Sequence, residues 1–126
     1  MEIVSISLDK KNLAELNKTQ GKLGFRSRSK LIRATIDSLL NEYRALESIK
    51  GHVDAVFTIT MEEHGKGEMN SLVKDFEEIV VTEIHQHHAS RCLKILITCG
   101  KAEQIRELFS HLKREKKVKS VQISIL

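Results

Sequence analysis

The chain has 126 residues, enough for one mid-sized domain or two small ones, and it contains no Pro and no Trp. No apolar run approaches the roughly 18 residues of a membrane span and no secretory signal is recognisable, so we expect a cytoplasmic protein with no membrane partner. The net charge of +4 lies wholly in residues 1–50, which hold 10 Lys and Arg against 6 Asp and Glu. A basic excess concentrated on a small module raises the expectation of a nucleic-acid surface.

Residues 3–8 alternate in the period of a β-strand. One face is apolar and consists of Val4, Ile6 and Leu8. The other face consists of Ile3, Ser5 and Ser7. A lone strand leaves both edges unpaired, so we expect it to pair antiparallel with the same strand of a second chain across a twofold axis. The outer face of such a ribbon fits the major groove of DNA, where Ser hydroxyls can bond to base edges.

Two helices are predicted after this strand. Asp9 is an N-cap residue for the first helix, and Gly24 is its C-terminal stop. The second helix begins near residues 27–29 and runs to about residues 46–49, with apolar residues at i, i+3 and i+4 spacing. These elements predict a βαα module over residues 1–48.

The second half reads as a further module, over residues 52–126. Its predicted strands are residues 53–61, 79–87, 92–99 and 118–126, and its predicted helices are residues 68–76 and 101–113. Gly100 is expected to break the chain after the third strand of the module. The order βαββαβ is the ferredoxin-like arrangement, so the fold class is α+β. The basic run at residues 113–119 is expected to be a solvated helix end, not a second DNA surface.

A group of metal-ligating residue types lies around one predicted hairpin. His85 and His87 are two positions apart on a strand and therefore share a face. A turn at residues 88–91 places Cys92 opposite His87, pointing the same way. Two imidazoles and a thiolate suit Zn(II), Cu or Ni(II). Cys99 is seven positions from Cys92, on the other face of the strand, and is expected to be a buried residue that packs in the interior.

Cys92 beside His87 also has the residue types of a catalytic nucleophile and its base. No oxyanion motif, orienting acid or phosphate-binding loop accompanies them. We therefore expect no enzymatic activity. Two further alternatives stay open: an effector of another kind, such as an amino acid, and an interaction module without a ligand.

Residues 1–47 resemble the ribbon-helix-helix regulators. The resemblance lies in the segments VSISLD, GFRSRS and KLIRATIDSLL. It implies operator DNA as the partner, base reading by Ser5 and Ser7, and a phosphate bound at the start of the second helix by Arg28 and Ser29, where helix N–H groups favour an anion. Completing the predicted DNA-binding set are Ile3, Arg26 and Lys30. Many members carry Arg or Lys where this chain has Ile3, so readout there is weaker or directed at a thymine methyl.

Nearly the whole chain resembles the NikR family of nickel-responsive repressors. The resemblance is carried by His-x-His at residues 85–87, by Cys92 and by the segment CLKILITCG. It implies an ACT-like second domain, nickel as the bound metal and repression of metal uptake genes. It also implies a homotetramer through the second domain, with the N-terminal strands pairing in homodimers and the metal between subunits.

The chain departs from the family at the metal site. The spacing from His87 to Cys92 is one residue shorter than usual, and residues 73–78 hold no His where the family supplies its fourth ligand from another subunit. Other residues can complete the shell: His64, His88, Asp75, Glu77 or Glu78. A carboxylate in the fourth position favours Zn(II) or Co(II) over planar Ni(II).

Overall fold

The computed structural model describes residues 1–62 and 66–126 of the chain, which form two compact units, Met1–Arg44 and Ala45–Leu126. The helices are α1 (Lys10–Leu23), α2 (Arg28–Glu47), α3 (Lys66–Asp75) and α4 (Ala102–Arg114). The strands are β1 (His52–Glu62), β2 (Val80–His88), β3 (Arg91–Lys101) and β4 (Val118–Ile125). No helix in the described ranges has the length and apolar character to cross a membrane.

The first unit contains α1, with the predicted caps, and α2 up to Arg44. The side chain of Asp9 accepts a hydrogen bond of 2.7 Å from the Asn12 backbone N–H, which satisfies a free donor at the start of α1. Gly24 ends this helix with φ 74°, a left-handed conformation that favours glycine. At the start of α2 the Ser27 hydroxyl accepts from the Lys30 backbone N–H at 3.1 Å.

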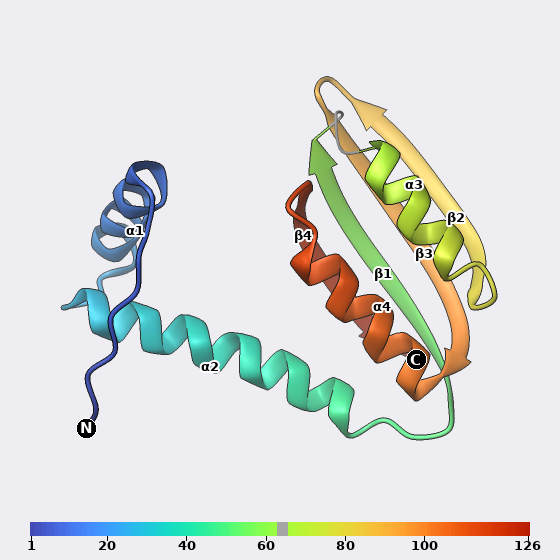
Figure 1. Cartoon of the computed structure of the whole chain (residues 1–126), viewed down its shortest axis with the longest axis horizontal. Helices are drawn as coiled ribbons and strands as arrows, with labels where there is room; N and C mark the ends of the chain where they lie inside the picture. Colours follow the sequence, from blue (N-terminus) through green and yellow to red (C-terminus); the bar gives the residue numbers. More distant parts are fainter. Residues whose placement is uncertain (63–65) are drawn as a thin grey trace. The chain divides into compact units, whose positions relative to one another are not determined.

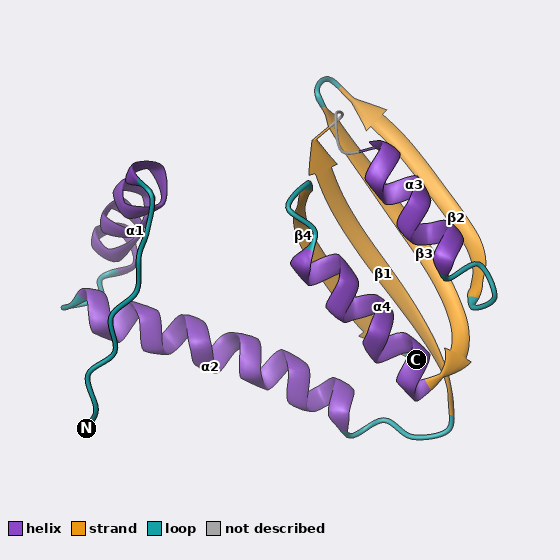
Figure 2. Cartoon of the chain, viewed as in Figure 1, coloured by secondary structure: helices purple, strands orange, loops and turns teal. Residues whose placement is uncertain are grey.

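Residues 1–9 belong to neither a helix nor a strand in the single chain (Figure 2). The predicted strand at residues 3–8 is therefore not formed here, because a strand is defined by backbone pairing and the expected pairing partner is a second chain. Ile3 and Val4 are 97% and 80% exposed, respectively. Large apolar side chains on α2 are exposed as well, namely Ile36, Leu39, Leu40 and Tyr43.

The second unit is a four-stranded antiparallel sheet in the order β2-β3-β1-β4, with α3 and α4 on one face (Figure 1). The predicted βαββαβ order and the α+β class are thus confirmed. The inward residues of β1 alternate along the strand, and Ala55, Phe57 and Ile59 are completely buried under the helices. The strand and helix limits differ from the prediction by one or two residues at most ends.

Gly100 does not break the chain, contrary to prediction. β3 continues to Lys101, and Gly100 pairs with Val53 of β1. A side chain at Gly100 would begin 2.5 Å from Cγ2 of Ile79, so the glycine makes room for a buried neighbour. A glycine inside a strand pattern signals close packing as well as a chain break, and here packing is the reason.

Candidate metal centre on the β2–β3 hairpin

The β2–β3 hairpin brings three metal-ligating residues to one face of the sheet. His87 lies directly opposite Cys92 in the antiparallel register, as predicted, and Ala89 in the turn has φ 54°. His85 is two residues along β2 on the same face. This face is the one covered by α3 and α4, because Cys92 belongs to the same buried cluster as Leu96.

The ligand atoms of these three residues converge. The available nitrogen and sulfur atoms of His85, His87 and Cys92 all lie within 4.8 Å of one another, and His87 Nδ1 is 3.1 Å from Cys92 Sγ. The two imidazole rings are tilted by 45°, with centroids 4.4 Å apart. Cys92 is buried, His85 is half-buried and His87 is exposed. The cluster therefore opens to solvent on the His87 side.

This donor set fits a transition metal ion. Ligand atoms on one tetrahedral ion lie roughly 3–4 Å apart, given metal–nitrogen and metal–sulfur bonds of about 2.0–2.3 Å. The separations within the cluster are already close to that range, so binding requires only small side-chain movements. A bound ion would act through its coordination geometry, holding β2 and β3 to a fixed arrangement and leaving at least one position open.

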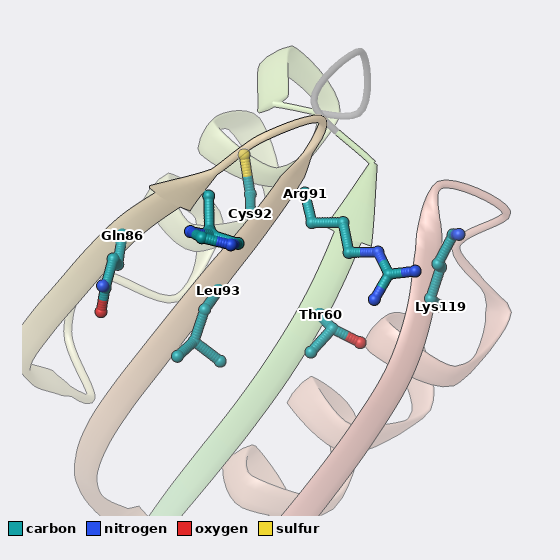
Figure 3. Close-up of a pocket in the computed structure, with 7 residues that line it drawn as sticks. Thr60, Gln86, Arg91, Cys92, Leu93 and Lys119 are labelled. Atoms are coloured by element: carbon teal, nitrogen blue, oxygen red, sulfur yellow. The ribbon is translucent and has the colours of Figure 1, made fainter.

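The residues considered for that position that the structure describes are not brought to the cluster. His88 follows His87 on β2 and so has the opposite strand phase. It lines a pocket together with Arg91, Leu93 and Lys119, which are labelled in Figure 3. Glu77 and Glu78 lie in the turn before β2, whereas His87 lies near the far end of that strand. Asp75 ends α3 and lines pockets with His111. His64 lies outside the described residues.

A buried lysine lies next to the cluster, and sequence reasoning missed it. Lys94 is opposite His85 in the register, is 1% exposed, and points to the helix-covered face. Its ammonium is 2.6 Å from Glu83 Oε1 and donates to Asn70 Oδ1 of α3 at 3.2 Å. The signal was present in the sequence: position 94 is in phase with the inward positions 92 and 96 of β3.

This ion pair predicts an asymmetric effect on stability. Glu83→Gln leaves the Lys94 ammonium buried without its counter-charge. Since Glu83 is 38% exposed, we expect a loss of about 1–3 kcal/mol in the free energy of unfolding, less than for a fully buried pair. Lys94→Met is expected to cost less, because the carboxylate left behind can be hydrated. Urea denaturation of metal-free protein at one fixed concentration measures both.

Glu78→Gln is the matched control for this pair, since it makes the same change at an exposed position. We expect it to alter the free energy of unfolding by less than about 0.5 kcal/mol. Equal losses from Glu83→Gln and Glu78→Gln would show that the Lys94 ion pair does not stabilise the domain.

Cys99 is exposed, so the prediction that it is buried packing was wrong. Its position on the other face from Cys92 was predicted correctly, but α3 and α4 cover the face of Cys92 and not that of Cys99 (Figure 1). Asp54 lies opposite Cys99 on β1, and a hydrogen bond to its carboxylate raises the pKa of the Cys99 thiol. The raised pKa disfavours the thiolate, which is the reactive form of a cysteine.

The predicted DNA-binding residues are all on the surface of the first unit. Each of the seven is exposed in the single chain, namely Ile3, Ser5, Ser7, Arg26, Arg28, Ser29 and Lys30. The Arg28 guanidinium donates to Asn17 Oδ1 of α1 at 3.0 Å, which holds it beside the start of α2. Arg28 and Ser29 are the first two residues of that helix, whose N–H groups lack intrahelical acceptors.

Known protein families match both units. Residues 51–126 match the family described as the NikR C terminal nickel binding domain, and residues 2–43 match the ribbon-helix-helix proteins of the copG family. The chain belongs to the NikR family. Membership implies DNA binding and oligomerisation, and the family is one of regulators, not of enzymes. The C-terminal domain is of the nickel-binding type, and its His and Cys cluster has the donors to bind a metal.

Named relatives agree with this assignment, and two solved structures have a similar fold. Proteins named "Putative nickel-responsive regulator" from Methanococcus maripaludis strain C7 and Methanococcus vannielii are 30% and 31% identical to the chain, covering all of it and 92% of their own length. The ACT domain of a GTP pyrophosphokinase from Chlorobium tepidum has a TM-score of 0.51 at 13% identity, over 58% of this chain and 86% of its own. An uncharacterized protein from Thermotoga maritima has a TM-score of 0.56 at 18% sequence identity. This match covers 60% of the present chain and 98% of the Thermotoga chain. These two likenesses concern the fold alone.

Proposed function

We propose that this protein is a metal-responsive, nickel-type repressor that binds operator DNA through its N-terminal unit and metal through His85, His87 and Cys92. The observation that carries the proposal is the convergence of those three side chains across the β2–β3 hairpin, with His87 Nδ1 3.1 Å from Cys92 Sγ. The spacing in the sequence makes such a cluster available, and the antiparallel register brings the donors together.

The DNA-binding unit functions as a dimer in this proposal. The support is the set of large apolar side chains that one chain leaves exposed on residues 3–8 and along α2, because a contiguous exposed apolar surface marks an interaction site. Pairing of residues 3–8 with the same segment of a second chain would cover Val4, Ile6 and Leu8. It would leave Ile3, Ser5 and Ser7 on the outer face of a ribbon of the width that fits a major groove.

The C-terminal domains assemble the dimers into a homotetramer, as in the family, with residues 1–48 and 52–126 as the two domains. A fourth metal ligand then comes from another subunit, or a water completes the shell. Metal binding shifts DNA affinity only if the metal prefers one arrangement of the assembly. In this proposal the metal-bound tetramer acts in the cytoplasm and represses metal uptake genes.

Elemental analysis of protein purified without a His tag tests the proposal directly. We expect about one transition metal ion per subunit after loading with Ni(II) or Zn(II) and removal of excess. Dialysis against a chelator is expected to remove the ion and to lower the affinity for DNA. A metal content near zero after loading would contradict metal binding. The protein would then be a DNA-binding protein that responds to a different effector.

A further inference from the structure

One arginine of α4 holds the C-terminal end of α2. Nη1 of Arg106 donates to the carbonyl oxygens of Leu46 and Ile49, both at 3.1 Å. Leu46 lies in the last turn of α2, where carbonyl groups lack intrahelical donors, and Ile49 follows the helix. A cation at this position also opposes the negative end of the helix dipole. The end of α2 is therefore satisfied by a charged side chain of the C-terminal domain.

A second bond from α4 holds the segment that follows. The backbone N–H of Ala102 donates to the carbonyl of Gly51 at 2.8 Å. Ala102 and Arg106 are four residues apart and share one face of α4. Leu46 is 1% exposed within the core cluster of the domain, and Ile49 packs against that cluster. Residues 46–51 are thus attached to the domain by main-chain acceptors and by buried apolar contact.

This attachment lies on the covalent path between the two units. The boundary between them falls inside α2, after Arg44, so the path from one unit to the other runs through the last turn of α2 and residues 48–51. β3 carries Cys92 near its start and leads directly into α4. The strand that bears a candidate metal ligand therefore continues into the helix that holds α2.

We infer that Arg106 is a positioning residue that couples metal binding in the C-terminal domain to the DNA affinity of the N-terminal unit. The inference rests on the proposed function. Sites are coupled only when both bias the same element, and here that element is the end of α2. When the Arg106 hydrogen bonds are present, the end of α2 moves together with α4. When they are absent, the end of α2 can rotate at residues 48–51, and metal binding no longer selects one arrangement of the DNA-binding unit.

The test distinguishes a loss of coupling between the metal and DNA sites from a loss of folding, of Ni(II) binding or of DNA binding. Arg106→Met keeps most of the aliphatic stem and removes the guanidinium, whereas Arg106→Lys restores the charge without the forked donors. Arg114→Met makes the same change at an exposed position of the same helix and is the control. Each variant is titrated with Ni(II), and its affinity is measured with and without Ni(II) for a duplex selected from random sequences by the metal-loaded wild type.

For Arg106→Met we expect unchanged Ni(II) affinity and unchanged metal-free DNA affinity. The metal-induced gain in DNA affinity should fall about tenfold, within the usual range of coupling between sites. Arg106→Lys should restore part of the gain, and Arg114→Met should keep all of it. Amide hydrogen exchange at residues 46–51 should be faster in Arg106→Met and unchanged in Arg114→Met.

A full metal-induced gain in Arg106→Met would overturn the inference, as would an equal loss in Arg114→Met. If Ni(II) does not change the DNA affinity of the wild type, the proposed function itself fails, and with it the role of Arg106 in coupling. In that case the hydrogen exchange still reports whether Arg106 holds α2. Equal exchange rates at residues 46–51 in Arg106→Met and the wild type would show that it does not.

Discussion

Replacing both His85 and Cys92 by alanine is expected to lower the affinity for Ni(II) by more than about a hundredfold. Changes to residues that only orient a metal ligand already cost ten- to a hundredfold, and this variant removes two of three donors. Cys92 is the only sulfur ligand of the cluster, and the single imidazole of His87 that remains is an exposed, weak site. Equilibrium dialysis with Ni(II) and Zn(II) measures the loss.

The chain offers a closely matched control for this variant. His88 and Cys99 lie on the same two strands as the cluster and, by strand alternation, on the opposite face of the sheet. His88→Ala with Cys99→Ala therefore removes the same residue types from the same hairpin and should retain metal binding. A loss of Ni(II) affinity as large as that of the first variant would contradict the assignment of the site. DNA binding should depend on metal in the control and not in the first variant.

Much of the cluster could be predicted because strand geometry is periodic. The alternation of β2 and the short turn at residues 89–90 are enough to put His85, His87 and Cys92 on one face. The caps at Asp9 and Gly24 were equally predictable, since each is a local interaction between residues a few positions apart. Local periodicity and capping do not depend on which distant element packs against them.

The features that were missed depend on such distant packing. Position 94 is inward by alternation, but its partners Glu83 and Asn70 come from two other elements, so the sequence does not show that a lysine there is stabilised. Cys99 was expected to be buried because cysteine usually is, whereas α3 and α4 cover the other face of the sheet and leave Cys99 exposed (Figure 1). The contacts of Arg106 with Leu46 and Ile49 join residues 60 and 57 positions apart and carry no local signal.

Substitutions in the N-terminal segment are expected to change the discrimination between DNA sequences without changing the affinity for DNA in general. Ser5→Ala together with Ser7→Ala should lower the preference for the selected duplex over random DNA by about tenfold or more, because each lost base contact costs about 1–3 kcal/mol of discrimination. Affinity for random DNA should change little, since both side chains are uncharged. Competition binding at one salt concentration measures the ratio.

Arg28→Ala should have the opposite signature. Arg28 is at the start of α2, where its charge, held there by Asn17, adds to the free N–H groups of the helix. Its loss should weaken binding to all duplexes and lower the slope of log affinity against log salt by about one. Lys116→Ala removes one charge from the basic run of the C-terminal domain and should leave that slope unchanged. If Ser5→Ala/Ser7→Ala keeps full discrimination while Arg28→Ala reduces it, the base-reading surface lies at the start of α2 and not on residues 3–8.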